Sequence, residues 1–135
     1  MMTRGISRFV VLCAFLTASA SVYAHHSLAG VYDLHKEAKI TGAFTAFRIV
    51  NPHSSMKMEV KNPDGSVTVW TLIGGSVGQI ARLGLKDKEG PNALTPGDEI
   101  TVTIVPAADG KSPVGLLSAI TYKDGHTLRF RSPDE

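Results

Sequence analysis

The chain has 135 residues, of which 43% are hydrophobic and 19% are charged, and its formal net charge is +2 with the histidines counted neutral. Two of its 14 lysines and arginines, Arg4 and Arg8, lie at the start, and without them 12 cations face 12 acids. A neutral domain lacks the basic field that non-specific nucleic-acid binding needs, so the composition excludes nucleic acid as the expected partner.

The first 24 residues have the features of a secretory signal peptide. Arg4 and Arg8 precede an apolar stretch at residues 9–16, and Val22-Tyr23-Ala24 offers a cleavage signal. We expect cleavage after Ala24 and export to the periplasm, although Ala18-Ser19-Ala20 leaves a cut after Ala20 open. The apolar stretch is shorter than the roughly 20 residues of a membrane-spanning helix, so no integral membrane segment is expected after cleavage.

The single cysteine, Cys13, belongs to this leader, so the sequence predicts a mature chain without disulfides. Residues 25–38 are typical of an extended or loosely ordered arm, and we place the folded domain at residues 39–135. β-Branched and aromatic residues predict a long curved strand over residues 39–50, with Gly42 at a bulge or sharp bend. Asn51-Pro52 ends this strand, because proline has no amide hydrogen for the ladder.

The next two strands form a predicted hairpin. Met56, Met58 and Val60 alternate with charged residues, and a second alternating run over residues 67–72 follows the turn chemistry of residues 62–65. The methionines are expected to fill the core.

A short helix follows, for which Ser76 is the predicted N-cap and Gly84 the end. Further strands are expected over residues 100–104 and 115–122, with a short final strand within residues 126–131. Three strands, a helix and two or three strands predict an all-β fold, a five- to six-stranded OB-like Greek-key barrel with the helix between strands three and four. Another small antiparallel barrel or a sandwich is the alternative.

Five short motifs are spread over the mature chain: His25-His26-Ser27, Asn51-Pro52-His53, Trp70 followed by Gly74-Gly75-Ser76, Arg82 with Gly84, and Pro96-Gly97-Asp98. Together they resemble the DUF6152 family of small exported bacterial proteins. The resemblance implies export and a small β fold, and it brings no established activity. The chain has Ile73 before the double glycine, where many members would have a glutamate, so no carboxylate role is implied there.

Cleavage after Ala24 would place His25 at a free N-terminus. Its amine and one ring nitrogen could then chelate a metal ion, and imidazole-type nitrogen suits copper, nickel and zinc. The hypothesis is a copper site in which His25 supplies two nitrogens and a second imidazole supplies the third. The competing interpretation is a solvated terminus without a bound ion.

His53 is the favoured third ligand, because Asn51-Pro52 fixes a turn at a strand end and would hold the ring in place. Its other interpretation is a loop histidine that bonds to local backbone. His26 and His35 are further candidate ligands. His126 follows a predicted hairpin tip and is expected to be exposed.

Trp70 is the candidate residue for a different ligand. It alternates with Val69 and Thr71, and OB barrels commonly bind ligands on strands two and three. Trp70 could stack on a flat ligand there, or it could belong to the core.

The sequence favours binding over catalysis, and no catalytic residue is predicted: no Ser/His/Asp order, paired carboxylates or mature cysteine nucleophile stands out. The leading expectation is a periplasmic β-barrel binding protein that holds a metal ion, with copper as the possible cofactor. The alternative is a module that binds a small molecule or a protein partner near Trp70 without a metal. No particular protein partner is indicated, and a copper oxidase ranks below both.

Overall fold

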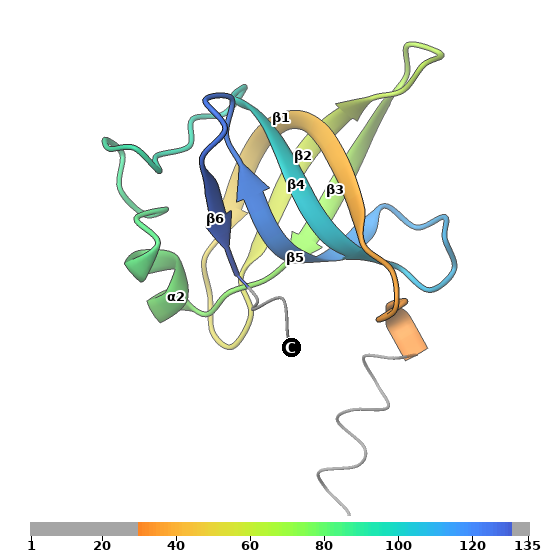
Figure 1. Cartoon of the computed structure of the whole chain (residues 1–135), viewed down its shortest axis with the longest axis horizontal. Coiled ribbons are helices and arrows are strands. Elements are labelled where there is room, and N and C mark those ends of the chain that lie inside the picture. The colour runs from red at the N-terminus through yellow and green to blue at the C-terminus, as the bar shows by residue number, and fades with distance from the viewer. Residues whose placement is uncertain (1–29, 131–135) are drawn as a thin grey trace, which may run out of the picture.

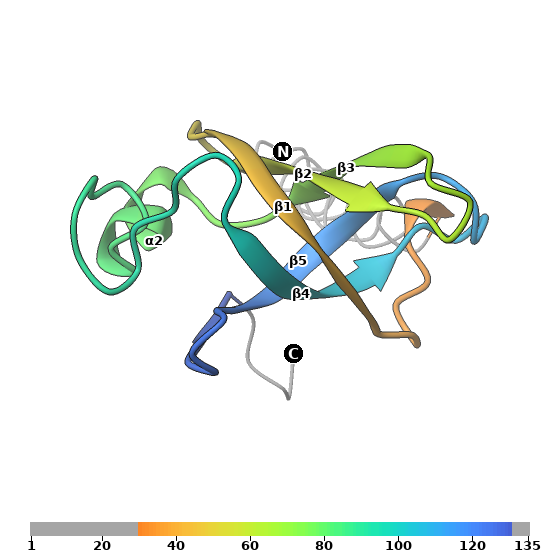
Figure 2. The ribbon, with the colours of Figure 1, turned by 90° about the horizontal axis from the view of Figure 1, so that it is seen from above.

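The computed structural model describes residues 30–130, and Figures 1 and 2 show these residues as a barrel of strands with a short helix at one side. The elements in chain order are β1 (Ala38–Arg48), β2 (Ser55–Lys61), β3 (Val67–Ile73), α2 (Val77–Arg82), β4 (Glu99–Pro106), β5 (Val114–Thr121) and β6 (Thr127–Arg129). The strands lie in the order β3-β2-β1-β4-β5-β6.

The barrel closes through a short parallel pairing. Thr71, Leu72 and Ile73 of β3 lie opposite residues 114–116 of β5, which joins the two sides of the sheet into a closed ring of five strands, β1 to β5. β6 extends the sheet as an extra strand beside β5. The predicted OB-like barrel, with one short helix between strands three and four, is confirmed. The predicted signal peptide lies outside the described residues.

β1 is the strand that both sides of the barrel share. Residues 38–43 pair with β4 and residues 43–48 pair with β2. Gly42 lies at this change of partner, and a Cβ atom there would overlap the carbonyl oxygen of Glu59. The register also shifts between Phe44 and Ala46. β1 therefore contains a bulge, but it lies after Phe44 and not at Gly42 as predicted, and close backbone approach is the reason for the glycine.

The core lies inside the barrel, where alternate residues of each strand point. Met56 and Met58 of β2 are fully buried, as the alternation predicts, and Leu72 of β3 faces them. The largest fully buried side chains are Met56, Met58, Leu72, Ile80, Ile100, Ile104, Leu117, Ile120 and Val102.

The helix α2 begins at a double cap. The Oγ atom of Ser76 accepts a hydrogen bond from the Gln79 amide at 3.2 Å, and Oδ1 of Asn51 accepts one from the Val77 amide at 3.1 Å. Ile80, the buried residue of the helix, joins the core cluster. The Ser76 cap is confirmed, and Asn51 ties the β1–β2 turn to the helix.

The described part of the N-terminal arm docks on the end of β4. Tyr32 bridges to Ala107, the Asp33 amide donates to the Pro106 carbonyl at 2.9 Å, and the Val31 carbonyl accepts from Ala108 at 2.9 Å. Residues 31–33 are thus held beside the end of β4 by backbone hydrogen bonds, in the segment that the sequence predicted to be extended or loosely ordered. Of the helices in residues 30–130, none has the length and apolar character needed to cross a bilayer.

Candidate functional site

His53 lies on an anchored turn between β1 and β2. The amide of its neighbour Ser54 donates to the Gly75 carbonyl at 2.7 Å, and the Gly74 amide donates to the Ser54 carbonyl at 2.9 Å. The Ser54 side chain is fully buried and donates to the Val50 carbonyl at 3.2 Å. His53 itself is exposed, so its backbone is held while its ring faces solvent. The Asn51–Pro52 peptide bond within this turn is cis.

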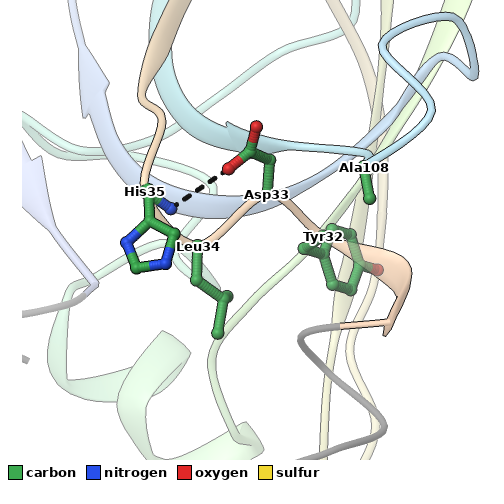
Figure 3. A pocket seen from close by; sticks show the side chains of 5 residues that line it. All are labelled: Tyr32, Asp33, Leu34, His35 and Ala108. Atoms are coloured by element: carbon green, nitrogen blue, oxygen red, sulfur yellow. Dashed lines mark hydrogen bonds between the residues drawn. The ribbon is translucent and has the colours of Figure 1, made fainter.

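His35 lies in the arm, beside a shallow pocket. Figure 3 shows the side chains that line this open pocket of about 250 Å³: Tyr32, Asp33, Leu34, His35 and Ala108. The His35 amide donates to Oδ1 of Asp33 at 3.3 Å, and Lys36 forms an ion pair with Asp33 at 2.9 Å. The hydrogen bond from Lys36 is the main cause that lowers the pKa of Asp33, which keeps a negative charge at the rim of the pocket.

The two described candidate ligands are not brought together. His35 precedes β1 and His53 follows it, and the 11 residues of this strand have a contour length of roughly 35 Å. Figures 1 and 2 agree that the docked arm and the β1–β2 turn lie toward opposite sides of the barrel. His25 and His26 lie outside the described residues. Within residues 30–130, three or more histidine, cysteine or carboxylate side chains nowhere gather in a metal-binding arrangement.

Trp70 lies on the inner side of β3. It shares this face with the buried Leu72, lies opposite Met58, and packs half-buried against the core. The sequence correctly predicted that Trp70 and Val69 point to different faces of β3, and burial shows that the face with the tryptophan is the inner one. Val67 and Val69 occupy the outer side, where they are 51% and 49% exposed.

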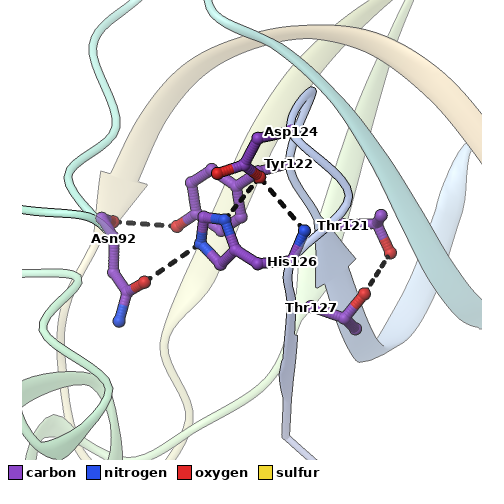
Figure 4. A network of polar contacts seen from close by, with 6 residues as sticks. All are labelled: Asn92, Thr121, Tyr122, Asp124, His126 and Thr127. Atoms are coloured by element: carbon purple, nitrogen blue, oxygen red, sulfur yellow. Dashed lines mark hydrogen bonds and ion pairs between the residues drawn. The ribbon is translucent and has the colours of Figure 1, made fainter.

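Sequence reasoning missed a polar network at the β5–β6 hairpin, shown in Figure 4. The His126 ring stacks on Tyr122 with centroids 4.1 Å apart, and its Nδ1 lies 2.5 Å from Oδ1 of Asp124. Its Nε2 lies 3.1 Å from Oδ1 of Asn92, and Tyr122 donates to the Asn92 carbonyl at 2.8 Å. The His126 side chain is only 33% exposed, so the expectation of an exposed ring was wrong.

Asn92 makes hydrogen-bond contacts through both groups of its side-chain amide. Its Nδ2 donates to the Leu83 carbonyl at 2.8 Å, which leaves Oδ1 to face His126. Both ring nitrogens of His126 then lie within hydrogen-bond distance of a side-chain oxygen, one of Asp124 and one of Asn92. Burial, followed by the charges of Asp98 and Asp124, raises the pKa of Tyr122 to about 12. The network therefore holds the loop that carries Asn92 against the β5–β6 hairpin, and this structural role accounts for it.

The fold and these surfaces define a small β-barrel protein of the OB type with exposed histidines at separate places. The model of a family of unknown function, DUF6152, matches residues 13–116. The chain belongs to this family, as its short motifs indicated. Searches of curated proteins and of solved structures each found no match.

Proposed function

We propose that this chain is an exported, periplasmic binding protein that holds a copper ion through histidine nitrogens. After removal of the signal peptide, the amine and ring of His25 supply two nitrogens, and a histidine of the barrel supplies the third. Copper favours such nitrogen ligands. The observation that carries the proposal is His53, whose ring is exposed while the backbone around it is hydrogen-bonded to Gly74 and Gly75.

A rigid backbone matters for a ligand because less conformational freedom is lost when the ion binds. His53 has this property, since the turn that carries it is tied both to the β3–α2 connection and, through Asn51, to α2. The site would therefore be half preformed on the barrel and completed by the N-terminal histidine.

His35 is the competing third ligand. The five residue steps from His25 to Gly30 extend at most about 18 Å, and Gly30 adjoins the docked arm that carries His35. β1 separates His35 from His53, so only one of these two histidines can bind the same copper ion as His25. His26 is the adjacent candidate for a fourth nitrogen.

Copper titration of the exported protein tests the proposal. The mass of the recovered protein first identifies its leading residue, and paramagnetic resonance then counts the nitrogens around one equivalent of Cu²⁺. We expect His53→Ala to weaken binding by about tenfold or more, since even partners outside the direct ligand set commonly contribute 10- to 100-fold. His35→Ala decides between the two barrel histidines, and His126→Ala controls for the loss of a histidine.

Three results would reject this function in whole or in part. Protein that begins with His25 and binds no stoichiometric copper excludes the site. A leading Ser21 removes the amine chelate. Equal binding in the His53→Ala and His126→Ala variants removes His53 from the site and leaves His35 as the residue to test.

A second candidate function is the binding of a small molecule or a protein partner on the barrel near Trp70, without a metal. The specific observation in its favour is the half-exposed pair Val67 and Val69 on the outer side of the strand that carries Trp70. Tryptophan fluorescence separates the two functions, because quenching by an organic ligand but not by copper favours this candidate.

A further inference from the structure

The strand β3 has a free backbone edge in its first half. It pairs with β2 from Val67 to Ile73, but its pairing with β5 begins only at Thr71. The Thr71 amide donates to the Pro113 carbonyl at 3.0 Å, so its backbone groups point away from β2. Backbone direction alternates along a strand, and the N–H and C=O groups of Val69 and Val67 therefore point the same way. Within residues 30–130, no strand pairs with them there.

The part of the hairpin that carries this edge stands clear of the barrel. β1 pairs with β2 only as far as Glu59, which lies opposite Val69, and we call the hairpin from this last shared row to its tip, residues 59–69, the ribbon. Figure 1 shows the ribbon extending away from the other strands. Natural proteins commonly protect an exposed edge with proline or with charged residues. This edge instead carries Val67 and Val69, each about half exposed.

We propose that this edge pairs with the same edge of a second copy of the chain, as an antiparallel two-fold dimer centred at Thr68. Val67 of each copy then lies opposite Val69 of the other. These two pairs form four main-chain hydrogen bonds, and the four valines cover one another on the outer face. The barrels lie at opposite ends of the joined ribbons, because each ribbon projects from its own barrel.

Backbone chemistry selects this register over its two neighbours. A two-fold axis at Val69 would pair Val67 with Thr71 of the second copy and would need the Thr71 amide, which already donates to Pro113. An axis at Val67 would pair Val69 with Gly65 of the second copy and would need the Gly65 amide, which donates to Asn62 at 3.0 Å. With the axis at Thr68, the amides and carbonyls of both valines are satisfied without breaking a bond of the monomer.

The charges beside the valines favour the same register. Lys61 lies opposite Val67 on the hairpin, and Glu59 lies opposite Val69. With the axis at Thr68, each row across the outer face has Lys61 of one copy at one end and Glu59 of the other copy at the other end. An axis at Val67 would place lysine at both ends of the central row, and an axis at Val69 would place glutamate at both ends. Opposite charges at the ends of a row attract and like charges repel, but the ends lie three strand spacings apart, roughly 14 Å, so salt screens most of this preference.

A concentration series tests the dimer. The contact is small, so we expect a reversible monomer–dimer equilibrium between micromolar and millimolar protein by sedimentation equilibrium. Trp70 lies on the inner face opposite Ser66 of the second copy in this register, and it is the single tryptophan. Its emission should therefore change over the same concentration range.

A matched pair of variants tests the edge. Val69→Lys places a charge at the proposed contact and should weaken dimerisation by about tenfold or more. Val31→Lys makes the same change at a side chain that is 53% exposed and away from the ribbon, and it should leave the equilibrium unchanged. Thr68→Cys should form a disulfide-linked dimer under oxidation, while Ala46→Cys on β1 should not.

Several outcomes would overturn the proposal. They are a monomer at every concentration, an equal effect of the two lysine variants, or no preference for cross-linking at residue 68. A monomer that co-purifies with an extended peptide, identified by mass spectrometry and released by Val69→Lys, would assign the edge to another chain.

Discussion

The two ends of the β2–β3 hairpin differ sharply, although the same two strands form both. Near α2, Ser54 and Ile80 are fully buried and backbone hydrogen bonds cross between the turns. In the ribbon, Val67 and Val69 are half exposed and only the partner strand holds them. The difference lies in the third strand: where β1 and β5 flank the hairpin it is part of the core, and where it passes beyond them it offers surface.

Truncating one apolar side chain at each end gives the largest expected contrast. Ile80→Ala leaves a cavity in the core cluster and should lower the free energy of unfolding by about 2–5 kcal/mol. Val69→Ala in the ribbon should change it by less than about 0.5 kcal/mol. Urea unfolding followed by Trp70 fluorescence measures both values. Similar losses would show that the ribbon is as tightly packed as the core.

Gly42→Ala sharpens the comparison at the point where β1 changes partner. The added Cβ meets the Glu59 carbonyl oxygen, a backbone atom, so β1 or β2 must shift. We expect a loss of about 1–3 kcal/mol, as for other overpacked sites. Gly30→Ala is the control, because its Cβ would meet no atom within 4 Å. Equal stability of the two variants would contradict the close approach.

Two serines extend the contrast to polar groups. Ser54→Ala removes a buried hydroxyl that donates to the Val50 carbonyl and should cost about 1–2 kcal/mol. Ser66→Ala, in the exposed turn of the ribbon, should cost less than about 0.5 kcal/mol. Thermal unfolding of both variants at one pH measures the difference. A larger loss at Ser66 would reverse the ranking of the two ends.

Local chemistry made the strands and the helix cap predictable. The alternation around Met56 and Met58 requires only a strand with one buried face, and Ser76 needs only the amide of Gln79, three residues ahead. The length of the β3–β5 pairing was not predictable, because it depends on where two strands distant in sequence happen to meet. The free edge at Val67 and Val69 is a consequence of that length.

The candidate site was predictable to a smaller extent. Asn51-Pro52 indicated the turn that carries His53, but the anchoring of this turn depends on Gly74 and Gly75, more than 20 residues away. The surroundings of His126 depend on Asn92, at a separation of 34 residues, and no spacing rule links the two. The separation of His35 from His53 follows from the path of β1 around the barrel.

Acid titration gives the smallest expected effect. It compares Asp109, in the loop that leads into β5, with Asp64, at the tip of the ribbon. Hydrogen bonds from the Ser112 side chain and from the Lys111 and Ser112 amides lower the pKa of Asp109 to about 2. Because the folded pKa lies below the unfolded value of about 3.9, Asp109 contributes stability above that value, and the contribution is lost as the pH falls toward 2.

Asp64 in the ribbon has its pKa lowered mainly by hydrogen bonds from the side chain and amide of Ser66, with a smaller contribution from its own amide. We therefore expect Asp109→Asn to flatten the fall of stability between about pH 4 and pH 2 more than Asp64→Asn does. Urea midpoints measured across this range for the two variants test the order. A stronger effect of Asp64→Asn would mean that the hydrogen bonds in the turn of the ribbon contribute more to stability than those around Asp109, the reverse of what the two sets of bonds indicate.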